Sequence, residues 1–125
     1  MERVGEAAFD GNRLRRSGTW VVGFLADWCP YCRSFAPALE AMERAGGRNV
    51  LWAEVNDEES PLWDRFEIRV VPTLLVFRDG AEVFRRDGRF ARGLNAKDVT
   101  AVEAFLGPAS PPPTSTAPGT GAASL

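Results

Sequence analysis

Two cysteines, Cys29 and Cys32, are the only thiols in the chain, and Pro30 and Tyr31 separate them. This spacing places both sulfurs on the first turn of a helix, where a disulfide can form and be reduced again. A structural disulfide, or two buried thiols that only pack, would use the same residues. The apolar run before the motif and a proline-interrupted strand pattern far downstream favour the redox interpretation. The predicted chemistry is therefore reversible thiol–disulfide exchange.

Histidine is absent from the chain. Without imidazole there is no Ser–His or Cys–His catalytic pair, and one chain holds too few soft ligands for a zinc site. We therefore expect no metal and no other cofactor. Any reaction must use thiols, carboxylates, water and the backbone.

Length and charge limit the possible partners. A chain of 125 residues with 45% hydrophobic content can form one core, and a net charge of −2 without blocks of like charge predicts no nucleic-acid partner. The first ten residues do not resemble a secretory signal, and the apolar run 21–26 is too short to span a bilayer. We expect a cytoplasmic monomer without a membrane partner.

Strand and helix patterns alternate around the cysteines, which predicts an α/β fold. The run 20–25 is continuously apolar, as in a strand buried on both faces. Segment 30–45 has helical spacing, because Phe35, Leu39 and Met42 share one face, and two glycines end it. The remaining predicted elements before the last helix are a short helix over 6–16, a strand over 49–55, a helical piece over 61–66, and strands over 73–77 and 82–86.

Turn and cap residues set the order of the C-terminal half. Asp79-Gly80 is a strong hairpin signal, so the last two strands are predicted to be antiparallel. Asn95 is the expected N-cap of a helix over 96–106, which carries an amphipathic stripe. The predicted domain therefore spans residues 1–107.

Composition changes after Gly107. Residues 108–125 hold five prolines among Ser, Thr, Gly and Ala, with Leu125 as the one large apolar side chain. Such a segment cannot bury enough surface to offset the entropy of ordering, so we predict a disordered tail. It could be a passive tail or linker, or a ligand for a proline-recognising domain.

Over residues 20–84 the chain resembles the thioredoxins. The matching residues are the run Phe24-Leu25-Ala26-Asp27-Trp28-Cys29, then Cys32 and Pro37, and later Val70-Val71-Pro72-Thr73-Leu74-Leu75-Val76-Phe77 with Asp79-Gly80. The resemblance implies a thioredoxin-like three-layer α/β fold, with a central mixed β-sheet and helices on both faces. It also implies a protein-disulfide oxidoreductase.

The family resemblance gives two prolines a role. It implies a cis Val71-Pro72 bond that lies against the disulfide and leaves the Val71 backbone free to pair with an extended substrate. An edge or strand-start proline is the simpler alternative. Pro37 costs about 3 kcal/mol in a regular helix interior and should kink the helix, as after the thioredoxin motif.

The two thiols are expected to differ in role. Cys29 lies at the helix start, where unpaired amides and the positive end of the dipole favour a thiolate, so it is the predicted nucleophile. Cys32, more shielded one turn along, would resolve the mixed disulfide. Pro30 suits the first helical position. Trp28 and Tyr31 could simply pack, but beside an exposed thiol they are expected to form an apolar rim for partners.

Some residues depart from the thioredoxin pattern. Pro-Tyr between the cysteines is the glutaredoxin choice, where thioredoxins carry Gly-Pro, yet the Gly-Gly segment that glutaredoxins use for glutathione is missing after Pro72. Thioredoxins also bury an Asp near the resolving thiol and pair it with a Lys. Those positions read Gly23 and, by ungapped counting, Ala53, while Glu54 should point to the side opposite Ala53. Because both the Asp and the Lys are missing here, neither leaves an unpaired buried charge.

These observations predict a thiol–disulfide oxidoreductase that acts on protein disulfides, with a thioredoxin-reductase-like enzyme or glutathione as electron donor. A glutaredoxin-like or oxidant-leaning exchange enzyme is one alternative. A binding module whose cysteines gate a partner interface is another. The predicted catalytic residues are Cys29 and Cys32, and the predicted substrate-binding residues are Trp28, Pro30, Tyr31, Val71 and Pro72.

Overall fold

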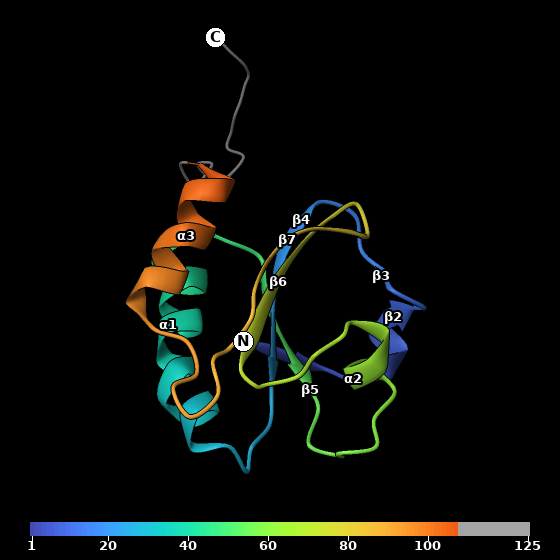
Figure 1. Ribbon diagram of the computed structural model, residues 1–125. Coiled ribbons are helices and arrows are strands. Elements are labelled where there is room, and N and C mark those ends of the chain that lie inside the picture. Colours follow the sequence, from blue (N-terminus) through green and yellow to red (C-terminus); the bar gives the residue numbers. More distant parts are fainter. Residues whose placement is uncertain (108–125) are drawn as a thin grey trace, which may run out of the picture.

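A five-stranded mixed sheet forms the centre of the fold in the computed structural model, which describes residues 1–107 (Figure 1). The first three strands across the sheet run parallel, and the last two are antiparallel to their neighbours. In spatial order the strands are β1 (Glu2–Val4), β5 (Val50–Glu54), β4 (Thr19–Leu25), β6 (Thr73–Arg78) and β7 (Ala81–Arg86). The predicted mixed sheet is confirmed.

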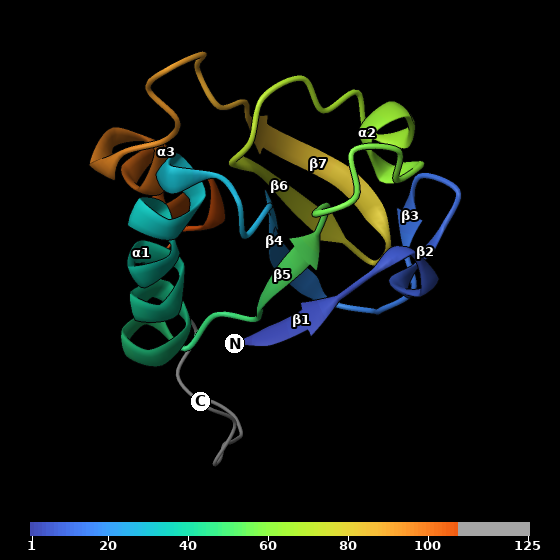
Figure 2. The ribbon, with the colours of Figure 1, turned by 90° about the horizontal axis from the view of Figure 1, so that it is seen from below.

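Helices cover both faces of this sheet, as predicted. Figure 2 shows α1 (Pro30–Gly46) and α3 (Ala96–Leu106) on one face, and the short α2 (Leu62–Arg65) on the other. A small hairpin of β2 (Phe9–Asp10) and β3 (Arg13–Leu14) lies on the same side as α2.

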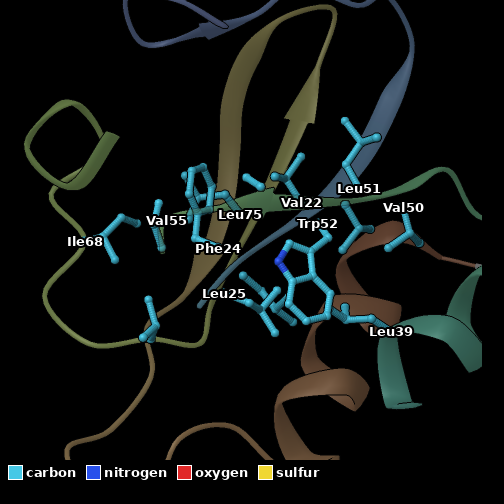
Figure 3. Close-up of a cluster of buried hydrophobic side chains, with 14 of the residues drawn as sticks. Val22, Phe24, Leu25, Leu39, Val50, Leu51, Trp52, Val55, Ile68 and Leu75 are labelled. Carbon is cyan, nitrogen blue, oxygen red and sulfur yellow. The ribbon is translucent and has the colours of Figure 1, made fainter. Parts of the chain in front are cut away.

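The two faces of the sheet have different cores, parts of which appear in Figure 3. On the α2 side, Phe24 is in contact with a cluster of aromatic rings from Phe9, Phe66 and Phe77, with centroid distances of 5.1–6.0 Å. On the α1 side, Leu25 and Leu39 share the core with the indole of Trp52 (Figure 3). β4 lies between both layers, and its carboxyl end, from Val21 to Leu25, is buried.

The predicted helix over 6–16 is wrong. Only a single 3-10 turn, Glu6–Ala8, forms there, and the chain then makes the β2–β3 hairpin. Gly11 adopts a φ of +60° in the turn, and Phe9 pairs with Leu14 so that both side chains are buried. Burial of this pair over the aromatic cluster outweighs the local helical pattern.

Strand β1 was absent from the sequence prediction. It is three residues long and pairs in parallel with β5, with Arg3 beside Trp52. Its first two residues are exposed, so no alternating apolar pattern marks it.

The turn and cap predictions are confirmed. Asp79 and Gly80 occupy the β6–β7 turn with φ of +50° and +91°, the left-handed values that such a hairpin turn requires. Asn95 caps α3, and its side chain accepts a hydrogen bond from the Lys97 N–H at 2.8 Å. The predicted disordered tail over 108–125 lies outside the described residues.

Across residues 1–107, no helix combines the length and the apolar character needed to cross a bilayer.

Candidate functional site

The two thiols lie at the junction of β4 and α1. Cys29 is the N-cap of α1, with extended backbone angles, and Pro30 opens the helix. The N–H of Cys32 donates to the Cys29 carbonyl at 3.1 Å, which closes the first turn. Proline is tolerated here because its missing N–H would have no partner inside the helix. The cysteine spacing therefore brings both sulfurs to the helix start, as predicted.

Cys32 is fully buried and its sulfur accepts a hydrogen bond from the Ala26 N–H at 3.4 Å. Burial raises the pKa of the Cys32 thiol to about 12; the Ala26 bond opposes this shift, and the neighbouring Cys29 adds to it. At neutral pH Cys32 is therefore a neutral thiol.

Cys29 is less exposed than expected, because only 5% of the residue is accessible. The expectation that the Cys29 thiol is exposed is therefore wrong. Cys29 lines a groove, and its thiol donates to the carbonyl oxygen of Val71 at 3.5 Å. The expected order of shielding holds, with Cys32 the deeper of the two. Both cysteines are free thiols in this structure.

The Val71-Pro72 peptide bond is cis, as the resemblance implied. Val71 lies two residues before β6, outside the strand ladder, and its carbonyl faces the Cys29 sulfur. The backbone of Val71 is thus beside the reactive pair, and an extended chain laid along it would pass the Cys29 sulfur.

An apolar groove of about 300 Å³ opens at Cys29. Trp28 and Tyr31 are 49% and 41% exposed, so they form a rim and do not pack in the core. The lining of this groove contains the predicted site residues Trp28, Cys29, Pro30, Tyr31 and Val71. It also contains residues that the sequence did not predict, among them Trp63, Arg69 and Phe90. A larger groove of about 630 Å³ runs between α1 and α3, but neither cysteine lines it.

Sequence reasoning missed the residues that hold Asp27 and Trp28 in place. Asn56 accepts from the Asp27 N–H at 2.6 Å and from the Trp28 indole at 2.9 Å, and donates to the Asp27 carboxylate at 2.8 Å. Arg3 adds two bonds of 3.0 Å to that carboxylate. The hydrogen bond from Asn56, followed by that from Arg3, holds the pKa of Asp27 below its usual value. A sequence signal existed for Asn56, because it follows a strand parallel to β4 and the carboxyl ends of parallel strands meet at one edge.

The expectation that Ala53 is the residue paired with Gly23 is wrong. Strand register puts Gly23 beside Trp52, whereas Ala53 lies beside Phe24 on the opposite face. Glu54 points to the side of the sheet opposite Ala53, as predicted. It therefore lies on the same face as Gly23, and its side chain is exposed. Counting back from Pro72 without a gap therefore does not find the residue that pairs with Gly23.

Apolar side chains fill the space beside Gly23. A Cβ atom at Gly23 would lie 2.7 Å from the Cδ1 atoms of both Leu25 and Leu39. Leucine side chains therefore lie close against this glycine, and no buried carboxylate has room there without their movement.

Comparisons with known proteins agree with this geometry. Residues 1–98 match the sequence profile of the family described as Thioredoxin. A thioredoxin of Rhodospirillum rubrum is 40% identical over 81 residues, which cover 64% of this chain and 78% of that protein. A thioredoxin of Staphylococcus saprophyticus is 39% identical over 83 residues, covering 65% of this chain and 77% of its own length.

A solved structure of Plasmodium falciparum thioredoxin has the same fold. It superposes with a TM-score of 0.68 at 23% identity, and the match covers 86% of this chain and all of that one.

Proposed function

Since the chain belongs to the thioredoxin family and is a thiol–disulfide oxidoreductase, we propose that it reduces disulfides in proteins, with Cys29 as the attacking thiol and Cys32 as the resolving thiol. The observation that carries these roles is the unequal placement of the sulfurs. Cys29 lines a groove that opens to solvent, and Cys32 is fully buried with a pKa raised to about 12.

The reaction needs two exchanges. The Cys29 thiolate attacks one sulfur of the substrate disulfide, a mixed disulfide forms, and the other substrate sulfur leaves as a thiolate that takes a proton. Cys32 then loses its proton and attacks the Cys29 sulfur, which releases the second substrate thiol. Two electrons and two protons pass to the substrate, and the protein keeps a Cys29–Cys32 disulfide.

The surroundings of the thiols support a polypeptide substrate. The Val71 backbone faces the Cys29 sulfur and lies outside the strand ladder, so an extended chain can pair with it. We assign substrate contact to Trp28, Pro30, Tyr31, Val71 and Pro72.

The sequence around Pro72 and the free dithiol bear on the electron donor and on the cellular compartment. A thioredoxin-reductase-like enzyme is favoured over glutathione as electron donor, because the Gly-Gly segment expected for glutathione binding is missing after Pro72. A dithiol of this kind works as a reductant where thiols are kept reduced, which favours the cytoplasm. All residues assigned to catalysis and substrate contact come from one chain, so a monomer is sufficient for the reaction.

Insulin reduction tests the proposal. Wild type with a chemical reductant should accelerate insulin precipitation, and Cys29→Ser should not. Cys32→Ser should trap mixed disulfides with protein substrates, whereas Ser34→Ala, an exposed neighbour on α1, should behave as wild type. If Cys29→Ser retains full activity, the assigned roles are wrong. If wild type shows none but binds a partner in a redox-dependent way, the cysteines gate an interface instead.

A further inference from the structure

A phenylalanine stands almost fully exposed at the mouth of the groove. Phe90 is 87% accessible, and it belongs with Trp28 and Tyr31 to the large exposed apolar side chains of residues 1–107. Isolated exposed apolar residues need no explanation, but this one joins the lining of the groove that contains Cys29.

The turn that carries Phe90 is held at both ends. We call residues 89–93 the Phe90 turn. The N–H of Gly93 donates to the Arg89 carbonyl at 2.8 Å and the N–H of Arg89 to the Gly93 carbonyl at 3.1 Å. Ala91 and Gly93 take φ of +58° and +68°. A left-handed alanine is strained, so the fixed turn must be stabilised by its surroundings.

Contacts to the reactive centre supply part of that stabilisation. A Cβ at Gly93 would lie 2.8 Å from the Tyr31 Cβ and 3.4 Å from the Pro72 Cδ. Just before the turn, Gly88 lies against the Pro72 carbonyl, and its N–H donates to the Thr73 hydroxyl at 3.1 Å. The Phe90 turn is thus seated on both segments that flank the Cys29 sulfur; Figure 1 shows the β7–α3 connection beside the start of α1.

A buried carboxylate fixes the other side of the turn. Asp98 is fully buried and accepts from Arg89 at 2.6 Å, from Arg86 at 3.1 Å and from the Asn95 N–H at 2.8 Å. Phe90 is therefore presented by a structured turn tied to α3, and its exposure is not that of a loose loop.

Arg69 is the charged residue of the groove. Its guanidinium makes no hydrogen bond or ion pair within residues 1–107, and no carboxylate lines the groove with it. An unpaired arginine beside an apolar surface complements an acid on an incoming chain.

Building on the proposed function, we propose that Phe90 and Arg69 determine which disulfides are reduced: the preferred substrate is an extended polypeptide segment whose reactive cysteine is flanked by a large apolar residue and an acidic residue. The apolar side chain enters between Phe90 and the aromatic rim. The acidic side chain pairs with Arg69.

Peptide disulfides test this specificity. The probe is a symmetrical disulfide of a short peptide with Phe and Glu flanking one cysteine, synthesised in both orders. Companion peptides carry Phe→Ala, Glu→Gln, or both changes. Pre-reduced full-length protein is mixed with each disulfide, and the second-order rate of peptide thiol release is measured by chromatography in low and high salt.

Wild type should react fastest with the parent peptide in one of the two orders. Replacing Glu by Gln in the peptide should slow the reaction about two- to fivefold at low salt, and less at high salt. Arg69→Gln should abolish that difference, while Arg44→Gln, an exposed arginine in the last turn of α1, should keep it. Phe90→Ala should abolish the preference for Phe, so that the parent peptide and its Phe→Ala companion react at the same rate.

Equal rates with wild type for the parent peptides of both orders and all their companions would overturn the inference, as would faster reaction with glutathione disulfide than with any peptide. An equal loss of rate with every peptide in Arg69→Gln and Phe90→Ala would also overturn it. The proposed function fails separately, if wild-type protein releases no thiol from any of these disulfides.

Discussion

The sulfur of Cys29 lies 3.5 Å from the carbonyl oxygen of Val71, although 42 residues separate them in the chain. This contact joins the start of α1 to the segment that precedes β6. In the proposed mechanism, a substrate strand that pairs with Val71 would therefore lie next to the Cys29 sulfur.

Alkylation should separate the two thiols. In reduced protein near neutral pH, iodoacetamide should modify Cys29 at least about tenfold faster than Cys32, because the buried Cys32 thiol stays protonated and the thiolate is the reactive form. Peptide mapping after short labelling times gives both rates. Equal rates, or faster modification of Cys32, would contradict the assigned roles.

The pH dependence of Cys32 follows from its raised pKa. In Cys29→Ser, labelling of Cys32 should keep rising up to pH 10 without a plateau, because burial is the largest cause of the shift to about 12 and remains in the variant. In denatured protein, the control, the labelling rate should level off once the pH passes the ordinary cysteine pKa of about 8.5. A plateau at that value in the folded variant would show that burial does not set the pKa.

Acid should weaken the contribution of Asp98 to stability. Burial alone would raise the pKa of Asp98, but hydrogen bonds from Arg89, the Asn95 backbone and Arg86 outweigh it, and the pKa lies below the usual value. A carboxyl with a lower pKa in the folded state stabilises the fold above its unfolded pKa of about 3.9, and this contribution disappears as pH falls through the folded value.

Asp98→Asn should therefore lower the free energy of unfolding by about 1–2 kcal/mol at pH 7. The difference from wild type should shrink as urea titrations are repeated from pH 5 down toward pH 2. Asp64→Asn, an exposed acid in α2, should change stability little at any pH. A difference that does not depend on pH would exclude the charge of Asp98 as its source.

Gly23 should not accept a side chain without cost. A Cβ there overlaps the ends of Leu25 and Leu39, so Gly23→Ala should destabilise the fold by about 1–3 kcal/mol. Gly23→Asp should destabilise the fold more, because it also buries a carboxylate without a partner. Gly5→Ala, where no atom lies within 4 Å of the new Cβ, should change stability by less than about 0.5 kcal/mol. Urea unfolding checks all three, and a neutral Gly23→Asp would show that the leucines can move aside.

The reduction potential should reflect the Pro-Tyr dipeptide. Pro30 and Tyr31 form the helix start that solvates the Cys29 thiolate, and stabilising that thiolate makes the couple more oxidising. We expect a potential above about −270 mV and nearer about −200 to −230 mV, measured by equilibration with glutathione buffers. Replacing the dipeptide by Gly-Pro should lower the potential. A wild-type value at or below about −270 mV would show that the dipeptide does not set it.

Local signals were sufficient for much of the fold. The spacing of Cys29 and Cys32, the apolar run of β4 and the cap at Asn95 each have a cause within a few residues, and each prediction agrees with the structure. The segment 6–16 was misread because its conformation depends on Phe9 reaching rings from distant strands. The partner of Gly23 was misassigned because strand register cannot be read by counting residues through a loop.

Long-range contacts explain what was missed at the site. Arg3 lies in β1 and Asn56 follows β5, whereas the groove residues come from α2 (Trp63), the α2–β6 connection (Arg69) and the β7–α3 connection (Phe90). Nothing in the neighbourhood of Phe90 in the sequence indicates that it reaches the thiols. Its position depends on the ion pair of Arg89 with Asp98 and on the contact of Gly93 with Tyr31.

The order of the strands also bears on self-association. The two outer strands, β1 and β7, each have one edge without a partner strand in the sheet, and such an edge could pair with another copy of the chain. β1 is only three residues long, and β7 carries Glu82, Arg85 and Arg86 next to a shift of register at Val76 and Phe77. A short outer strand on one side and a charged, irregular one on the other are features that discourage edge-to-edge pairing between copies of the chain.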